Sequence, residues 1–360
     1  MDAAGLSWSI VHGSEGYPER VGRDLDILLS RTRHEQAVRI VQTVAEEQGW
    51  KSCLIPLSWA GAPVYLWKLH GNNLLSFEMH FIDRIDWAGC ILATGDDTCS
   101  EPHRLNGLPI AIWPGFAKRV LTQILAGCWE RIMERPDDFQ IKAYESAGLL
   151  IPMKRLFGEE AGPLLLDLIR RNDIEEIKHL SFRYRLQLLK RALIPLTNVR
   201  LSLRWLHGKI ARTLGLANWR PPILIISQYN HSGTDLVTEV ASYLGFGKTI
   251  FLNSNFPKSI MGRMRLKWNI HVQRGLFRLV AIQNNKFDRS LSDITDFFGK
   301  SFHNHNTFIV NVDEENKSNC SWSYQDMDGN ASAMNSSCEM LTSEIAYKYM
   351  ECINRLASKS

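Results

Sequence analysis

The stretch 24-DLDILLS-30 decides the fold of the first part of the chain. Asp24 and Asp26 are two positions apart in an otherwise mostly apolar segment, and a β-strand places such positions on the same face. The preceding segment 8-WSIVHGS-14 also has the character of a short strand. We therefore expect two strands, the second of which carries a pair of carboxylates on one side.

Further along, residues 34–50 carry apolar side chains at helical spacing and predict a helix that stops near Gly49. Residues 64–69 and 74–82 predict two more strands, with 71-GNN-73 as the turn between them. This order of strands around one helix predicts a small mixed sheet with the helix packed on it.

Two carboxylates that converge on one face repel each other unless a cation lies between them. Magnesium, a hard divalent cation that prefers oxygen ligands, suits Asp24 and Asp26. Glu78 lies between apolar neighbours on a predicted strand, where an unpaired acid is costly, so a metal-binding or general-base role would explain it. The dipeptide Gly13-Ser14 would let the backbone approach a phosphate closely and donate hydrogen bonds to it.

The middle of the chain is helical in character, with apolar stripes over residues 117–133 and 162–180. Residues 181–220 then contain nine basic and no acidic residues. This basic segment is a candidate for peripheral contact with an anionic membrane surface or a polyanionic glycan. The alternative is a solvated connector helix whose apolar face packs between domains, and the residues of that face are Leu186, Leu189, Leu193 and Leu196.

The C-terminal part predicts strands at 223–227, 278–282 and 307–313, which alternate with helices and so favour a parallel α/β sheet. The two helices are expected at 235–245 and 339–356. Residues 314–338 are rich in Asn, Ser and Asp, and predict a mobile loop.

Residues 10–30 and 74–81 resemble the N-terminal nucleotidyltransferase-like domain of bacterial two-domain proteins that are often labelled thymidylate kinase-like and are common in polysaccharide biosynthesis. The family element Gly-Arg-Asp-Leu-Asp-hydrophobic is matched by 22-GRDLDI-27. Its Asp-Leu-His strand is matched by 78-EMH-80, with Glu in place of Asp. The resemblance implies a basic helical connector and a C-terminal P-loop kinase-like domain.

The second domain departs from a working P-loop, which needs glycines to wrap the phosphates and a lysine to hold them. Ser227 and Ser232 stand at glycine positions, Gly233 stands at the lysine position, and only Thr234 matches the magnesium-binding hydroxyl. We therefore expect a kinase fold without kinase chemistry. An alternative is a sulfotransferase-like domain, because 231-HSGTDL-236 resembles the phosphate loop of that family.

The composition is that of a globular protein: 360 residues, 45% hydrophobic, 22% charged, with a net charge of +4. Seven cysteines without a CxxC pair indicate reduced thiols, and no signal peptide or membrane-spanning run is evident, so we expect a cytoplasmic protein. The predicted domains are a nucleotidyltransferase-like domain at 1–105, a helical and basic connector at 106–220, and a degenerate P-loop kinase-like domain at 221–360.

The function expected from these features is a magnesium-dependent nucleotidyltransferase that uses a nucleoside triphosphate and a small hydroxyl or sugar acceptor, without a nucleic-acid partner. The alternative is a non-enzymatic accessory protein that binds nucleotide but does not turn it over. The predicted catalytic and metal-binding residues are Asp24, Asp26 and Glu78. The predicted nucleotide-binding residues are Gly13, Ser14, Ser232, Gly233 and Thr234.

Overall fold

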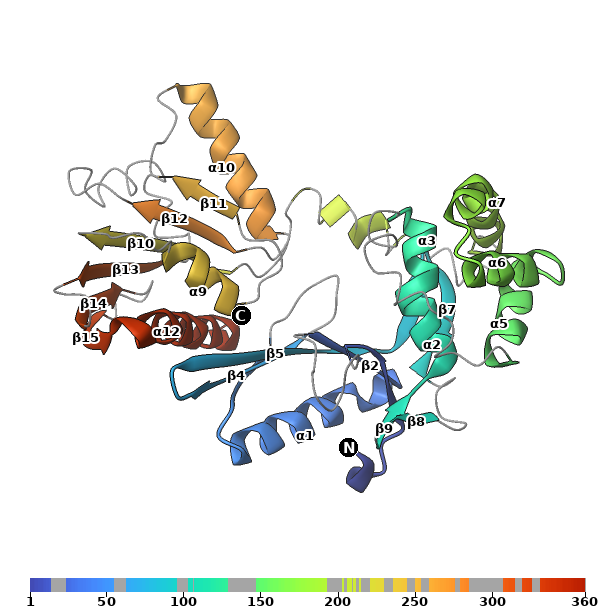
Figure 1. Ribbon diagram of the computed structural model, residues 1–360, viewed down its shortest axis with the longest axis horizontal. Helices are drawn as coiled ribbons and strands as arrows, with labels where there is room; N and C mark the ends of the chain where they lie inside the picture. The colour runs from blue at the N-terminus through green and yellow to red at the C-terminus, as the bar shows by residue number, and fades with distance from the viewer. Residues whose placement is uncertain are drawn as a thin grey trace. The chain divides into compact units, whose positions relative to one another are not determined.

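A computed structural model shows a mixed α/β protein with helices and mixed β-sheets (Figure 1). The structure describes residues 1–13, 24–54, 63–95, 103–105, 107–128, 147–192, 203, 206–208, 210–211, 214, 221–229, 236–244, 250–253, 259–275, 279–284, 307–314, 319–325 and 331–359.

The chain divides into two compact units, and neither is continuous in sequence. The first contains Met1–Val44 and Glu78–Lys209, and the second contains Ala45–Phe77 and Ile210–Ser360. The three domains predicted from the sequence, with boundaries near residues 105 and 220, remain a prediction.

In the first unit the strands are ordered β5-β2-β1-β9-β8. Strand β2 is parallel to β5 and antiparallel to β1, and β1 is parallel to β9, so this sheet is mixed as the sequence predicted. The strands that lie wholly or in part in the first unit are β1 (Trp8–His12), β2 (Asp24–Leu29), β5 (Asn73–Ile82), β6 (Arg84–Trp87), β7 (Cys90–Thr94), β8 (His103–Leu105) and β9 (Leu108–Ile110).

The helical part of the first unit follows the sheet in the chain. Helices α5, α6 and α7 pack against one another (Figure 1). The helical elements are η1 (Asp2–Ala4), η2 (Arg31–Arg33), α1 (His34–Glu47), α2 (Ile112–Phe116), the π-helical turn η4 (Ala117–Leu121), α3 (Thr122–Ala126), α5 (Ala147–Phe157), α6 (Ala161–Arg170) and α7 (Ile174–Ala192).

Two helices that the sequence predicted as single runs have different bounds in the structure. The helix predicted at 117–133 stops at Ala126, because Gly127 adopts a left-handed conformation that closes the helix end. The helix predicted at 162–180 is two helices, α6 and α7, because Asn172 turns the chain with a φ of 54°. Asparagine tolerates this left-handed conformation better than most residues.

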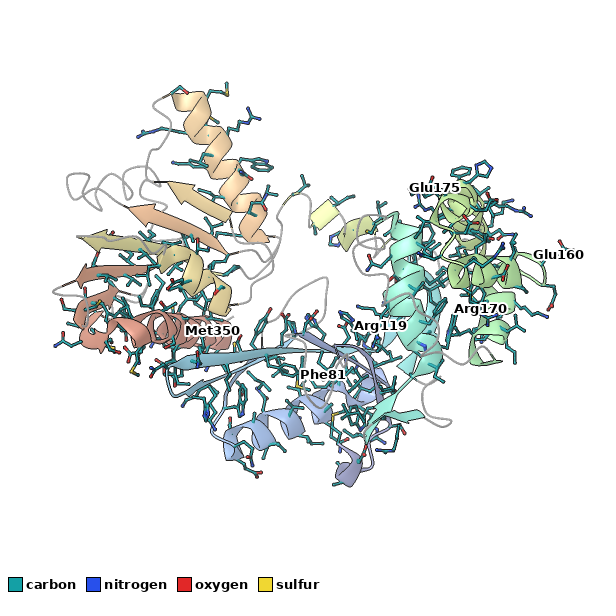
Figure 2. The ribbon with its side chains drawn as sticks, in the orientation of Figure 1. Phe81, Arg119, Glu160, Arg170, Glu175 and Met350 are labelled. Atoms are coloured by element: carbon teal, nitrogen blue, oxygen red, sulfur yellow. The ribbon has the colours of Figure 1, made fainter. Side chains whose placement is uncertain are left out.

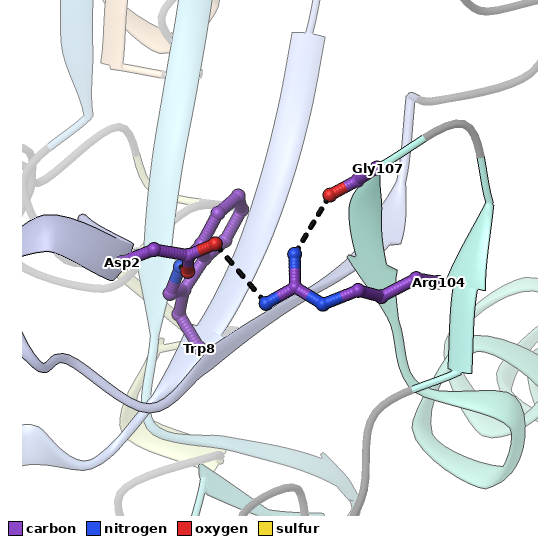
Figure 3. Close-up of polar contacts among 4 residues, drawn as sticks. All are labelled: Asp2, Trp8, Arg104 and Gly107. Atoms are coloured by element: carbon purple, nitrogen blue, oxygen red, sulfur yellow. Dashed lines mark hydrogen bonds and ion pairs between the residues drawn. The ribbon is translucent and has the colours of Figure 1, made fainter.

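The N-terminal turn η1 is tied to the β8–β9 hairpin by one acidic side chain (Figure 3). Asp2 accepts hydrogen bonds from Trp8 Nε1 at 2.7 Å and from Arg104 Nη2 at 3.1 Å. Arg104 also donates from Nη1 to the carbonyl of Gly107 at 2.8 Å. These hydrogen bonds lower the pKa of Asp2, first through Trp8 and then through Arg104.

The second unit contains a six-stranded sheet in the order β11-β12-β10-β13-β14-β15. The first four strands are parallel, as predicted, but β14 and β15 continue the sheet in antiparallel fashion. The prediction of a loop over 314–338 was therefore wrong, because described residues there form two strands. The strands of this sheet are β10 (Ile223–Tyr229), β11 (Ile250–Asn253), β12 (Val280–Asn284), β13 (Thr307–Glu314), β14 (Asn319–Gln325) and β15 (Ala331–Ser337). The second unit also contains β3 (Lys51–Leu54) and β4 (Val64–His70), which pair with each other in antiparallel fashion and are not part of this sheet.

A reason for that error is visible in β14 and β15. Alternate residues of β14, Cys320 and Trp322, are buried, while polar residues lie between them. Trp322 Nε1 donates to Ser336 Oγ of β15 at 2.9 Å, so polar residues that suggested a loop are satisfied across the strand pair.

The part of the second unit that the structure describes also has three helices: α9 (Leu236–Leu244), α10 (Ile260–Gly275) and α12 (Cys338–Lys359). Helices α9 and α12 lie side by side (Figure 1). Tyr349 of α12 is fully buried, meets the ring of Phe308 edge-on at 5.6 Å and donates a hydrogen bond to the carbonyl of Pro222 at 2.6 Å.

Candidate functional site

The predicted carboxylates lie on two adjacent parallel strands of the first unit. Asp24 on β2 is in register with Glu78 on β5, and Asp26 is in register with His80. Residues in register across a parallel pair face the same side of the sheet, as do residues two apart on one strand. The four side chains therefore share one face, and the spacing of Asp24 and Asp26 predicted this common face for those two residues.

The two aspartates have different surroundings. Asp26 is only 7% exposed, whereas Asp24 at the start of the strand is exposed. The Asp26 carboxylate forms an ion pair with Lys118, with 3.2 Å between Oδ2 and Nζ. This cation compensates for burial of the carboxylate charge, which would otherwise be strongly unfavourable.

Lys118 lies in η4, a π-helical turn between α2 and α3. Such turns are rare and often occur at functional sites. The next residue, Arg119, donates from Nε to the carbonyl of Val11 at 3.1 Å; Figure 2 shows it on the helical segment of this unit. Val11 lies where the β1–β2 register shifts, so Arg119 fixes the turn to an irregular point of the sheet.

Glu78 and His80 form a second pair, with 2.6 Å between Oε1 and Nε2. Burial by itself lowers the pKa of His80. The hydrogen bond and negative charge of Glu78, together with the charge of Asp26, outweigh that effect and raise the pKa above its usual value, although Lys118 opposes them. The site thus holds an Asp26–Lys118 ion pair and a Glu78–His80 pair on one face of the sheet.

The field of Lys118 also reaches Asp86 on β6. Burial raises the pKa of the Asp86 carboxyl, and the positive charges of Arg84 and Lys118 partly oppose that rise. Asp86 is thus a further carboxylate within the electrostatic reach of Lys118.

Gly13 has a packing role that the sequence did not suggest. Its φ is +91°, and a Cβ added to it would lie 2.0 Å from the carbonyl oxygen of Asp24. The absence of a side chain at Gly13 therefore allows β1 to pass the start of β2. Ser14, the other half of the predicted phosphate-binding pair, lies outside the described residues.

Among the residues that the structure describes, no group of three or more His, Cys, Asp or Glu side chains could hold a metal ion. Magnesium, however, is usually bound by one or two carboxylates together with waters and substrate phosphates. Two aspartates on one strand face fit such a shared site chemically. They do not fit a metal held by protein ligands alone.

The predicted nucleotide-binding residues of the second unit, Ser232, Gly233 and Thr234, lie outside the described residues. The strand that precedes them, β10, ends at Tyr229 and lies between β12 and β13 in the sheet.

Sequence reasoning missed Lys118 and Arg119, and treated His80 only as a supporting residue. The available signal was a Lys-Arg pair at the start of a strongly apolar helical segment. Charged residues in such a segment are rarely buried unless they are paired, so the pair indicated a partner elsewhere in the chain. No spacing rule connects residue 118 with residue 26, so the pair could not be assigned from the sequence.

The basic segment 181–220 is described only in part. On α7, Phe182, Leu186 and Leu189 are 71%, 42% and 39% exposed, while Tyr184 and Leu188 are buried. The connector-helix alternative predicted that Leu186 and Leu189 pack between domains. In the structure these two residues are exposed, and the buried face of α7 contains Tyr184 and Leu188 instead. Among the described helices, none is both long and apolar enough to cross a bilayer.

Comparisons of the chain with protein-family models, with curated proteins and with solved structures gave no match.

Proposed function

We propose that the first unit is a magnesium-dependent nucleotidyltransferase that joins a nucleotide to a hydroxyl group of a small acceptor such as a sugar. The observation that carries this proposal is the register of β2 and β5, which gives Asp24, Asp26, Glu78 and His80 a common face. Such a transfer requires acidic residues that bind a cation and an acid–base pair that removes the proton of the hydroxyl group.

In this proposal Asp24 and Asp26 hold magnesium together with the triphosphate. The ion would supply positive charge to the phosphate oxygens and orient them. Lys118, whose Nζ already lies 3.2 Å from Asp26, binds a phosphate oxygen and adds positive charge as the leaving pyrophosphate forms. Gly13 and Ser14 contribute backbone and hydroxyl donors to the same phosphates.

The Glu78–His80 pair is proposed to handle the proton. With Glu78 bound at Nε2, the imidazole presents Nδ1 as the acceptor when His80 is neutral. As the acceptor oxygen attacks the α-phosphorus and the bond to pyrophosphate breaks, Nδ1 takes the hydroxyl proton. The negative charge of Glu78 stabilises the imidazolium, consistent with the raised pKa of His80.

We further propose that the second unit is a kinase-like scaffold without phosphoryl-transfer activity and that the whole protein acts in bacterial polysaccharide or cell-surface glycan synthesis. The pathway assignment rests on the resemblance of residues 10–30 and 74–81. The parallel strands β11, β12, β10 and β13 support an α/β fold for this unit. The more specific proposal of a kinase-like fold rests on the resemblance alone.

The alternative is an accessory protein that binds nucleotide without turnover. The observation that favours it is that Asp26 and Glu78 already have partners, Lys118 and His80, so both acids could be structural. The two functions differ in one measurable property, which is product formation.

The test is pyrophosphate release by the purified full-length protein with each of the four ribonucleoside triphosphates, magnesium and a panel of sugars, alongside nucleotide binding by calorimetry. We expect magnesium-dependent binding and release, both lost in Asp24→Asn and Asp26→Asn. Asp167→Asn is a matched control, because Asp167 is an exposed carboxylate paired with Arg171 at 2.7 Å. Binding without release would support the accessory alternative, and neither binding nor release would overturn both.

A further inference from the structure

Helix α10 of the second unit presents large apolar side chains to solvent. Met261, Met264 and Trp268 are 77%, 63% and 57% exposed. In contrast, Ile270 and Arg274 near the end of the helix are buried, and Arg274 Nε donates to the carbonyl of Pro221 at 2.8 Å. The helix is therefore anchored at its C-terminal half and exposes its apolar groups in its N-terminal half.

The exposed apolar residues form one stripe. At about 100° per residue, Met261, Met264 and Trp268 fall within roughly 60° of arc, on the side of α10 opposite Ile270. Arg265 lies on one flank of this stripe, and His271, whose ring stacks on Trp268 with centroids 5.8 Å apart, lies on the other. We call Met261, Met264 and Trp268 the apolar stripe of α10.

The position of α10 in the unit leaves this stripe uncovered by α9 and α12. The connections β10–α9–β11 and β11–α10–β12 run in opposite directions across the sheet. Because such crossovers are right-handed, α9 and α10 must cover opposite faces. Helix α12 packs against α9, and α10 packs on β12.

The surrounding sequence carries a strong positive bias. Residues 240–287 contain no Asp or Glu, although the whole chain has 38 acidic residues. The same stretch contains eight basic residues: Lys248, Lys258, Arg263, Arg265, Lys267, Arg274, Arg278 and Lys286. On α10 itself, Arg263, Arg265 and Lys267 are exposed. A partner for this helix must therefore accept apolar groups and cations together.

We propose that α10 is an interfacial membrane anchor that binds bilayers rich in anionic lipid. A helix with Met and Trp on one side and Arg and Lys beside them lies in the plane of the headgroups, with its apolar stripe among the acyl chains. Tryptophan is favoured at that depth, and the cations bind lipid phosphate and carboxylate groups. The helix has 16 residues and lies along the surface of the bilayer.

The apolar stripe favours a lipid partner over a nucleic acid. A phosphate backbone would be bound by the cations alone, and three exposed apolar side chains would add nothing to that contact. At a bilayer, the same side chains leave water, and each one that inserts strengthens binding by about tenfold or more.

The test uses the full-length protein and co-flotation with vesicles of about 30% phosphatidylserine in phosphatidylcholine, where each surface cation strengthens binding by about fivefold. Met264→Ser/Trp268→Ser and Arg265→Gln/Lys267→Gln are the two test variants. Their matched controls on the first unit are Ile151→Ser, which removes a 74% exposed apolar side chain, and Arg31→Gln/Arg33→Gln, which removes two exposed cations.

We expect the wild type to bind the anionic vesicles and not phosphatidylcholine alone, with each test variant weakened at least tenfold and the controls within twofold. Slower hydrogen exchange at residues 260–275 of the wild type on vesicles would locate the contact without any substitution. Three results would overturn the proposal: no vesicle binding, equal losses in test and control variants, or tight DNA binding that depends on Arg265 and Lys267 but not on Trp268.

Discussion

Lys118 Nζ lies 3.2 Å from Oδ2 of Asp26, and the pair joins a π-helical turn to a buried strand that starts 94 positions earlier in the sequence. The Asp26 side chain is 9% exposed, while the Lys118 side chain is 36% exposed. The pair therefore has one end in the protein interior and one end within reach of solvent and of a ligand. This asymmetry determines what substitution of each partner should do.

Substitution of Asp26 by Asn should abolish magnesium-dependent nucleotide binding while the fold persists. We expect affinity for nucleotide in the presence of magnesium to fall at least about 100-fold, because a charged ligand to the cation is lost. Stability should fall by only about 1 kcal/mol, since Lys118 can be solvated once its partner is neutral. Calorimetric titration and urea unfolding measure the two effects. Unfolding without a change in magnesium response would mean that Asp26 is structural.

Replacement of Lys118 by Met should destabilise the protein by about 2–3 kcal/mol, because the buried Asp26 carboxylate loses its counter-charge. Lys118→Arg, which retains the charge, is the control and should lose less. If Asp26 also binds magnesium, the ion should stabilise Lys118→Met more than the wild type, since it replaces the missing cation. Thermal unfolding with and without magnesium measures this difference, and equal stabilisation of both proteins would count against a metal at Asp26.

Gly13→Ala should be far more harmful than the same change at Gly5. Both glycines have positive φ, +91° and +65°, but an added Cβ at Gly13 would lie 2.0 Å from the Asp24 carbonyl, whereas nothing lies within 4 Å at Gly5. We expect Gly5→Ala to cost about 1 kcal/mol of stability and Gly13→Ala at least about 3 kcal/mol, from backbone strain plus displacement of β2. Urea unfolding measures the loss of stability in each variant, and the difference between the two losses is due to the clash at Gly13. Equal losses of stability would exclude the clash.

The stability due to the Glu78–His80 pair should depend on pH. Because the folded-state pKa of His80 is raised, its contribution is fully present below the unfolded-state value of 6.5 and is lost as the pH rises through the folded-state value. The stability difference between the wild type and His80→Gln should therefore be larger at about pH 5.5 than at about pH 9. In Glu78→Gln the trend should reverse, because burial then lowers the pKa of His80. A difference that grows with pH would contradict the assignment of the pair.

The purified protein should not phosphorylate thymidylate or another nucleoside monophosphate. The sequence has Gly233 where a P-loop lysine is needed and Asn284 where the strand-end arginine is expected. Loss of one positive group in phosphoryl transfer typically costs about 10³–10⁵ in rate. An assay of ADP formation from ATP and thymidylate checks this, with an active thymidylate kinase as the control. Turnover at ordinary kinase rates would overturn the prediction, and turnover only with a sulfate-donor nucleotide would support the sulfotransferase alternative.

The sequence by itself determined the local structure around the proposed site. Strand alternation is a property of two residues on one chain segment, so the common face of Asp24 and Asp26 followed from their spacing alone. Two further features were likewise predictable, namely the strands at 64–69 and 74–82 and the parallel core of the second unit. Short apolar runs bounded by turn residues are typical of buried strands. The polar stretch 314–338 was misinterpreted because its hydrogen-bond partners lie on neighbouring strands.

Only the tertiary structure decided which residues surround those carboxylates. The parallel pairing of β2 with β5 sets Glu78 beside Asp24 and His80 beside Asp26, and a shift of one residue would have moved both to the other face. The π-helical turn brings Lys118 to Asp26, and the tight passage of β1 past β2 explains Gly13. Register and packing depend on contacts between distant segments, and the electrostatics of the site follow from them. Spacing along the chain carries no information about those contacts.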